Sequence, residues 1–173
     1  MPFKTKHLSM KKLLFSSLLL VSILLIGKQT QAQDYKTAAG LKFGGYENGF
    51  SIKYFTTADI ALEGELGFRA HGVVITGLYE IHQEAFGVKE LKFYYGAGGH
   101  IGAEGSGVYQ TYDGSNETYN RSHILLGVDG VIGLEYRIPN APIAVSLDLN
   151  PRVELATGPF FDIAPGLGLK YTF

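Results

Sequence analysis

The chain has 173 residues, with 15 Lys and Arg, 16 Asp and Glu and no cysteine, so neither disulfides nor thiolate metal sites are available to it. Five of the basic residues and none of the acidic ones lie in residues 1–33, which leaves residues 34–173 with 10 basic and 16 acidic residues and a net charge of −6. This negative charge disfavours a nucleic-acid partner, and residues 34–173 suffice for one domain.

Residues 1–33 have the three parts of a secretory signal peptide. Lysines at positions 4, 6, 11 and 12 precede an apolar run over 13–26, and Gln31-Ala32-Gln33 forms a small, polar exit. The run of 14 residues is shorter than the roughly 20 that cross a bilayer as a helix. We therefore predict cleavage near Ala32 or Gln33, a signal peptide over 1–33 and an exported domain over 34–173.

Eight segments of the exported part alternate apolar and polar residues with a period of two, and turn residues separate them. This pattern predicts an all-β protein, an eight-stranded antiparallel up-and-down barrel. The predicted strands cover about 35–45, 50–56, 59–70, 72–82, 91–103, 123–138, 143–156 and 161–173.

From residue 59 onward, every charged residue of these strands falls on one face, and the large apolar residues fall on the other. A slip of one residue would exchange the two faces, so the strand register is strongly specified. We predict that the charged face carries a structural salt-bridge network made by Glu63, Glu65, Arg69, Glu80, Asp129, Glu135, Arg137, Asp148, Arg152, Glu154 and Lys170.

Two architectures share this alternation. In a soluble lipocalin-like barrel or a sandwich the apolar face forms the core, whereas in a membrane barrel it meets lipid and the charges line the lumen. The charged face also holds many glycines, among them Gly98 and Gly133. Glycine weakens a strand that faces solvent but leaves room inside a narrow barrel, so the glycines favour the membrane barrel.

The connections agree with that reading. With both chain ends in the periplasm, the connections at 57–58, the seven or so residues around Phe86 and Gly87, and 139–142 face the periplasm and are short. The longest connection, 104–122, falls on the outer side. The outer-side connections, of which this is the longest, are the predicted contact region of the surface.

The last strand alternates from Phe161 onward and ends Lys170-Tyr171-Thr172-Phe173. With the leader and the eight strands, this ending resembles the small eight-stranded outer-membrane β-barrels of Gram-negative bacteria, the OmpX and OmpA type. The resemblance implies a monomer in the outer membrane that contacts lipid and lipopolysaccharide, and assembly by the barrel-assembly machinery through the Phe173 strand. Unlike the OmpA type, no peptidoglycan-binding domain is expected after the barrel.

The charged face of such a barrel has two interpretations. Rings of charge could select ions in a pore, or paired charges could fill a lumen that is just wide enough for side chains. If Asn140-Ala141 is a hairpin turn, Asp129 lies opposite Arg152, which is the pair that a filled lumen needs. We therefore expect a closed, salt-bridged interior, with a small pore as an alternative.

No catalytic motif is recognised, and no cofactor is expected. The His-x-Ser element of a lipid A deacylase is absent, because His100 and His123 are each followed by other residues. His71, His100, Glu104 and His123 lie near the outer ends of their strands, but their spacing matches no metal motif and we assign no metal ligands. The predicted function is non-enzymatic, structural or surface-binding; a lipid A or lipid-modifying enzyme is the alternative.

Overall fold

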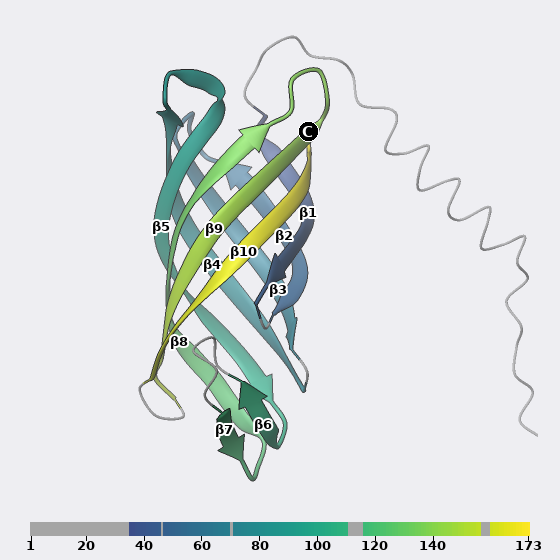
Figure 1. The fold of residues 1–173 in the computed structure, drawn as a ribbon, viewed down its shortest axis with the longest axis vertical. Helices are drawn as coiled ribbons and strands as arrows, with labels where there is room; N and C mark the ends of the chain where they lie inside the picture. The colour runs from purple at the N-terminus through teal and green to yellow at the C-terminus, as the bar shows by residue number, and fades with distance from the viewer. Residues whose placement is uncertain (1–34, 46, 70, 111–115, 157–159) are drawn as a thin grey trace, which may run out of the picture. The chain divides into compact units, whose positions relative to one another are not determined.

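The computed structural model describes residues 35–45, 47–69, 71–110, 116–156 and 160–173, and these residues form a closed antiparallel barrel of eight strands (Figure 1). The prediction of an all-β, eight-stranded up-and-down barrel is confirmed. Neighbouring strands follow the order β1-β10-β9-β8-β5-β4-β3-β2. The barrel strands are β1 (Thr37–Gly44), β2 (Asn48–Phe55), β3 (Ile60–Arg69), β4 (Gly72–Ala85), β5 (Val88–Glu104), β8 (His123–Arg137), β9 (Ile143–Glu154) and β10 (Phe160–Thr172).

The first and last strands close the barrel. β1 pairs with β10 from Ala38↔Thr172 to Gly44↔Gly166. Beyond the ladder, the amide of Phe173 donates to the carbonyl of Thr37 at 2.8 Å, and the amide of Lys36 donates to the carbonyl of Phe173 at 3.2 Å. Closure therefore removes the exposed edges that an open sheet would leave.

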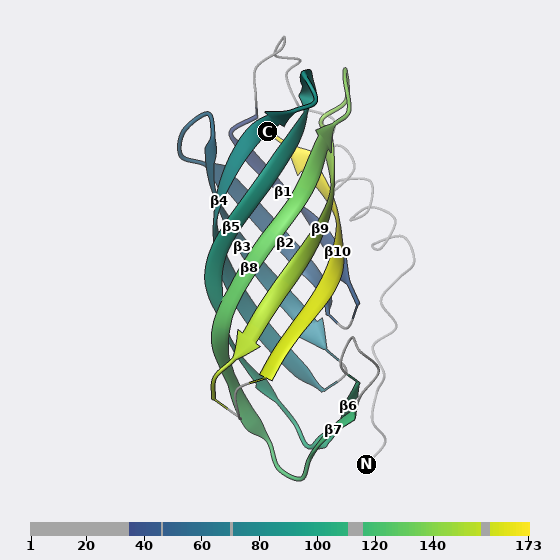
Figure 2. The ribbon, with the colours of Figure 1, turned by 60° about the vertical axis from the view of Figure 1, so that its left-hand side comes forward.

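The barrel has two distinct ends (Figures 1 and 2). The first and last described residues, Tyr35 and Phe173, lie at one of them, together with the connections at 56–59, 86–87 and 138–142; we call this the terminal end. The other end carries β6 (Gly107–Gln110) and β7 (Asn116–Tyr119), and we call it the hairpin end. β6 and β7 pair only with each other, as a separate two-stranded sheet. In the region predicted as one long connection, the structure thus adds a short hairpin.

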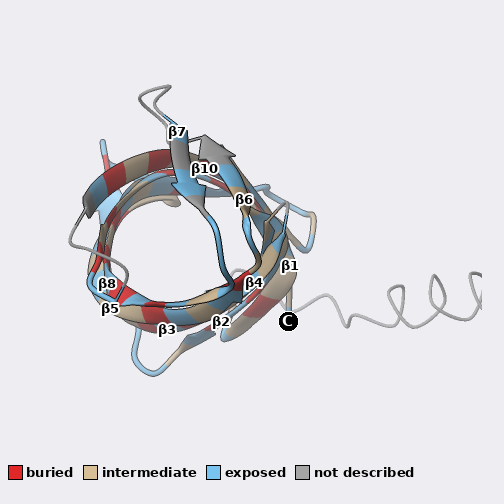
Figure 3. Ribbon diagram, turned by 90° about the horizontal axis from the view of Figure 1, so that it is seen from below, coloured by how far each residue is buried: buried red, intermediate tan, exposed pale blue. Residues whose placement is uncertain are grey.

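Burial alternates along the strands (Figure 3). The large apolar residues are mostly on the exposed, outward face. On β4, Ile75 is 56% exposed and Tyr79 is 47% exposed, whereas Glu80, the residue after Tyr79, is fully buried. The apolar side chains therefore do not form a core, and the arrangement of a soluble barrel or sandwich is not the one observed. The small buried apolar cluster contains Leu78, Tyr94 and Val131. No helix within the described residues is long and apolar enough to cross a membrane.

One predicted connection is wrong. The sequence predicts about seven residues of loop around Phe86 and Gly87, but β4 continues to Ala85 and β5 begins at Val88. The turn consists of Phe86 (φ 54°) and Gly87 (φ 70°), and two successive positive φ values are typical of a tight hairpin. The polar residues between 83 and 92 interrupt the alternation, and the pairing register shifts at Glu84/Ala85, so the pattern could not reveal these strand ends.

The predicted register at the next terminal-end hairpin is confirmed. Asp129 lies opposite Arg152, and the ladder extends to Arg137↔Ala144. The loop over 139–142 is closed by the amide of Ile138, which donates to the carbonyl of Ile143 at 2.9 Å. Asn140 adopts a φ of 61°, a conformation that asparagine tolerates better than most residues.

Candidate functional site

The interior of the barrel is an ion-pair network. Among the described residues, its contacts join five Lys and Arg side chains, nine carboxylates and three histidines. Buried charges are stable only when they are paired and hydrogen-bonded. Because the two-residue alternation places the charged residues of the strands on the buried inner face, they need such a network. From the terminal end to the hairpin end it has three parts.

Lys53 occupies the centre of the first part. Its side chain on β2 is fully buried, and its Nζ atom lies 3.0 Å from Glu63, 2.7 Å from Glu80 and 3.1 Å from Glu135. Lys170 on β10 contacts Glu63 at 2.6 Å. These five residues, which we call the Lys53 cluster, come from five strands and are each at most 3% exposed. The cluster thus blocks the lumen from wall to wall.

Aromatic rings cover the Lys53 cluster. The Nζ atom of Lys53 lies 4.4 Å from the ring centroid of Tyr94, a cation–π contact. The same ring stacks on His82 at 4.9 Å, and its hydroxyl donates to Asp148 at 2.6 Å. At the terminal end, the hydroxyl of Tyr35 donates to Glu135. The rings therefore pack against the cluster, whose members are each at most 3% exposed.

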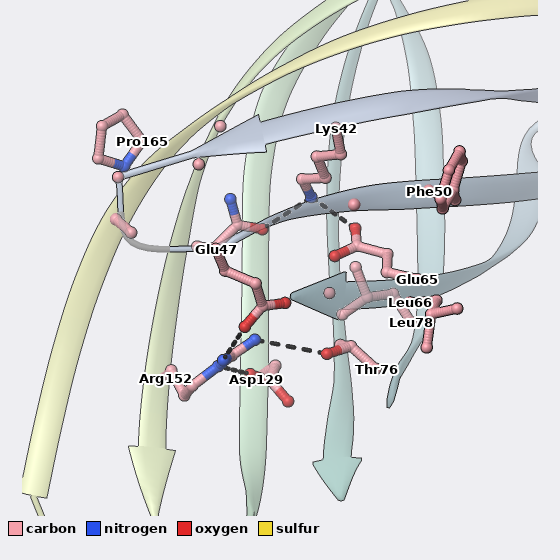
Figure 4. Close-up of a pocket in the computed structure, with 17 residues that line it drawn as sticks. Lys42, Glu47, Phe50, Glu65, Leu66, Thr76, Leu78, Asp129, Arg152 and Pro165 are labelled. Carbon is pink, nitrogen blue, oxygen red and sulfur yellow. Dashed lines mark hydrogen bonds and ion pairs between the residues drawn. The ribbon is translucent and has the colours of Figure 1, made fainter. Parts of the chain in front are cut away.

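The second part is a small cavity on the hairpin side of the cluster (Figure 4). Lys42 crosses it and contacts Glu65 at 2.5 Å and Asp148 at 3.5 Å. Its Nζ atom also donates to Asn150 at 3.2 Å. The cavity leaves about 40 Å³ for the centres of water-sized molecules, which is space for a few waters.

The third part lies across the hairpin end, and we call it the outer chain. It alternates acidic and basic side chains, and its successive contacts are 2.5 to 3.4 Å long. Its members, in order of contact, are Glu154, His100, Asp129, Arg152, Glu47, Arg69, Glu104 and His123.

Glu47 links the two sides of the outer chain. It precedes β2 in the β1–β2 connection, yet its carboxylate points into the barrel and lies 2.9 Å from Arg69 and 3.1 Å from Arg152 (Figure 4). A Cβ atom at Gly67 would lie 2.0 Å from the Oε1 atom of Glu47. Glycine at position 67 therefore leaves room for the Glu47 side chain in the position that it takes over the mouth of the lumen.

The structure places the predicted network residues on the inner face. Arg137 lies near the terminal end, where it lines a small pocket with Tyr35 and Glu135. The ten others take part in the ion pairs above: Glu63, Glu65, Arg69, Glu80, Asp129, Glu135, Asp148, Arg152, Glu154 and Lys170.

Four charged members of the network are missing from the predicted set: Lys42, Lys53, Glu47, and Glu104, which the sequence indicated only as a candidate metal ligand. Lys42 and Lys53 lie on the first two strands, where the same alternation places them with the inward residues Gly40 and Ser51. The period-two pattern of these strands therefore identifies both lysines as inward residues. Glu47 carries no such signal, because it lies in a connection and reaches the interior only through the fold.

The histidines and Glu104 do not gather into a metal centre. Within the described ranges, no group of three or more histidine and acidic side chains has the arrangement of a metal site. His100 instead contacts Asp129 and Glu154, and His123 lies 3.4 Å from Glu104. The carbonyl of His71 accepts a hydrogen bond from the amide of Gly105.

Comparison with known proteins supports the fold. No family model matches the chain, and no curated protein matches it. The solved N-terminal β-barrel domain of Pseudomonas aeruginosa OprF is similar, with a TM-score of 0.58 and 20% identity over 80% of this chain and 100% of that one. Neisserial surface protein A gives a TM-score of 0.49 and 12% identity, over 79% of this chain and 94% of that one. The likeness to the OprF domain shows that the two chains share the barrel fold.

Proposed function

We propose that this chain is a non-enzymatic outer-membrane protein of a Gram-negative cell surface, with a structural or surface-binding role. In this proposal residues 1–33 are a signal peptide that is removed on export. The barrel over 34–173 is a monomer in contact with lipid and lipopolysaccharide.

The observation that carries the proposal is the distribution of polarity. Outward side chains on the described strands are large and apolar, such as Phe50, Ile75 and Leu147, which are 57%, 56% and 62% exposed. A soluble monomer rarely exposes an apolar patch larger than a few hundred Å². A lipid environment removes that cost, and closure of the barrel satisfies the backbone hydrogen bonds that lipid cannot.

The hairpin end is the proposed contact surface. Because Tyr35 and Phe173, the first and last described residues, both lie at the terminal end, a periplasmic position for them puts β6, β7 and the 104–122 connection outside the cell. The two strands extend beyond the barrel and pair only with each other, so changes in them leave the barrel ladders intact. At the opposite end, Phe173 is 67% exposed and its ring contacts Tyr171, which supports recognition of this strand by the assembly machinery.

The interior supports a non-enzymatic role. Its two most buried histidines, His82 and His100, contact carboxylates that are themselves buried. These two rings therefore act as hydrogen-bond partners of buried carboxylates. An acyl-transfer site instead needs an activated nucleophile beside the imidazole.

Cell fractionation followed by gel electrophoresis tests the proposal. Outer-membrane fractions are run with and without heating, and the unheated barrel is expected to migrate differently because detergent alone does not open it. A companion chain, in which residues 107–119 are replaced by a short Gly-Ser linker, should keep this shift while cells that carry it attach less to protein-coated surfaces. Recovery in the soluble periplasm with no gel shift would overturn the location, and unchanged attachment would overturn the role of the hairpin.

A further inference from the structure

A small pocket lies at the terminal end of the barrel, where β5 begins and β8 ends. Its lining includes three cationic side chains, Lys89, Lys92 and Arg137, and two carboxylates, Glu90 and Glu135. The pocket leaves about 20 Å³ for the centres of water-sized molecules, which is room for about two oxygen atoms of a group that otherwise stays outside. Both its size and its charges restrict what can bind there.

The pocket has more positive charge than its own carboxylates balance. Glu135 is already engaged by Lys53 at 3.1 Å, so three cations share one other carboxylate of the lining. In the part of the chain that the structure describes, no ion pair is formed by Lys89 or by Lys92. The lysines elsewhere on the inner face all contact carboxylates, so this pocket differs from the rest of the interior.

An irregularity of the β4–β5 hairpin, at the terminal end, brings the two lysines together (Figure 1). The register shifts beyond Glu84↔Lys92, and residues 89–91 have no opposite residue on β4. Residues three positions apart on a regular strand point to opposite faces, yet Lys89 and Lys92 line the same pocket. Extra residues in a strand re-aim side chains in this way and are frequent beside functional sites.

We propose that this pocket binds the phosphate group of an anionic ligand, either free phosphate or the headgroup of an acidic phospholipid. Ammonium and guanidinium groups recognise phosphate through short, charge-assisted hydrogen bonds. A phosphate group also fits the limited space, because it can insert part of its oxygen atoms between the cations while the remainder stays in solvent. The site goes beyond the proposed function, which assigns no ligand to the interior.

Two sources of phosphate are available at this position. Arg137 is the last residue of β8, and its neighbours Tyr136 and Ile138 are 40% and 37% exposed on the apolar outer face. In the proposed membrane the pocket therefore lies where the apolar band ends and the headgroups begin. The same mouth of the lumen faces the free ions of the periplasm. Only the headgroup source rests on the proposed location, which the gel-shift experiment tests separately.

Binding is measured by nitrogen–proton NMR of the folded chain in a maltoside detergent, which carries no phosphate of its own. One series adds sodium phosphate. The other uses nanodiscs of phosphatidylcholine with or without phosphatidic acid, a lipid with a terminal phosphate. We expect saturable shifts of the amide signals of residues 87–92 and 137. Shifts in the first series alone identify a free ion as the ligand, and shifts in the second identify the headgroup. The absence of saturable shifts in both series would overturn the proposal.

The paired substitution of Lys89→Gln with Lys92→Gln removes two of the three cations and keeps most of the side-chain length. It should raise the apparent dissociation constant at least about tenfold, because a hydrogen bond to a charged group contributes that much. The matched control is Lys36→Gln, since Lys36 is exposed at the same end, lies over the ring of Tyr54 and does not line the pocket. Both variants should keep the gel shift of the folded barrel. Equal weakening in the two variants would indicate general attraction of charge and would overturn the site.

Discussion

Lys53 neutralises more buried carboxylates than any other cation among the described residues. Three carboxylates lie within 3.1 Å of its Nζ atom, and the side chain has no exposed surface. Burying such a cation is costly by itself, and the cost is offset only by the anions around it. Glu63 has Lys170 as a second cation at 2.6 Å, but the loss of Lys53 would remove a contacting cation from all three carboxylates at once.

Lys53→Met should destabilise the barrel by about 3 to 5 kcal/mol, because it leaves buried carboxylates without their cation. The free energy of unfolding in detergent, measured by urea titration, checks this value. Lys89→Met is the control, since Lys89 is exposed and its replacement should change stability by no more than about 0.5 kcal/mol. A loss at position 53 as small as that at position 89 would show that the three carboxylates do not rely on Lys53.

The inward glycines act at the level of the strands, and for two different reasons. A Cβ atom at Gly98 would lie 1.8 Å from the carbonyl oxygen of Gly77 on the neighbouring strand, so it is the close approach of β4 and β5 that requires glycine. A Cβ atom at Gly133 would lie 2.7 Å from the carbonyl oxygen of Leu147 on the neighbouring strand and 2.9 Å from the ring of Tyr94, so there the filled lumen adds to the close approach of two strands. The predicted shortage of space inside the barrel therefore contributes at Gly133, whereas at Gly98 the nearest atoms are all backbone.

Gly98→Ala should therefore disrupt the β4–β5 pairing. Overpacking in a protein core usually lowers the free energy of unfolding by about 1 to 3 kcal/mol, and we expect a loss at least that large here. The unfolding midpoint in urea and the fraction of unheated protein that keeps the folded gel mobility both report this loss. Gly77→Ala is the same chemical change on the same strand pair, but a Cβ atom there meets nothing within 4 Å. It should leave both readouts unchanged, and equal effects at the two positions would contradict the role assigned to close approach.

As a whole molecule, the barrel is a filled cylinder. The Lys53 cluster and its aromatic rings fill the terminal half, the cavity beyond has space for only a few waters, and the outer chain crosses the hairpin end. Ion flow would require the charged side chains of the cluster to separate, and each separation leaves a buried charge unpaired. The closed ring of backbone hydrogen bonds opposes widening of the wall.

Planar bilayers that contain the folded protein should accordingly show no conductance steps above the background of the bilayer. Insertion is checked in the same preparation by the gel shift on heating, so that absent current is not confused with absent protein. Bilayers formed with detergent alone supply the background. Uniform current steps that appear only with the folded protein would show that the Lys53 cluster does not close the lumen.

Much of this architecture is readable from alternation alone. Period-two patterns from residue 59 onward predicted the strands and their inner face, and the register at Asp129 and Arg152 followed from a short turn at Asn140. The turn at Phe86 and Gly87 was not readable, because a run of polar residues hides the ends of β4 and β5 there. Hairpin β6–β7 was missed since each strand is only four residues long.

The sequence by itself determined which side chains share a face, because the two-residue period of a strand is a local property of the chain. Which charges meet was decided only by the tertiary structure. Lys53 reaches Glu135 across the lumen, and Glu47 folds inward over Gly67 to reach Arg152. Such contacts depend on closure, strand coiling and the path of a connection, and these bring together residues about 80 to 100 positions apart that no periodicity relates.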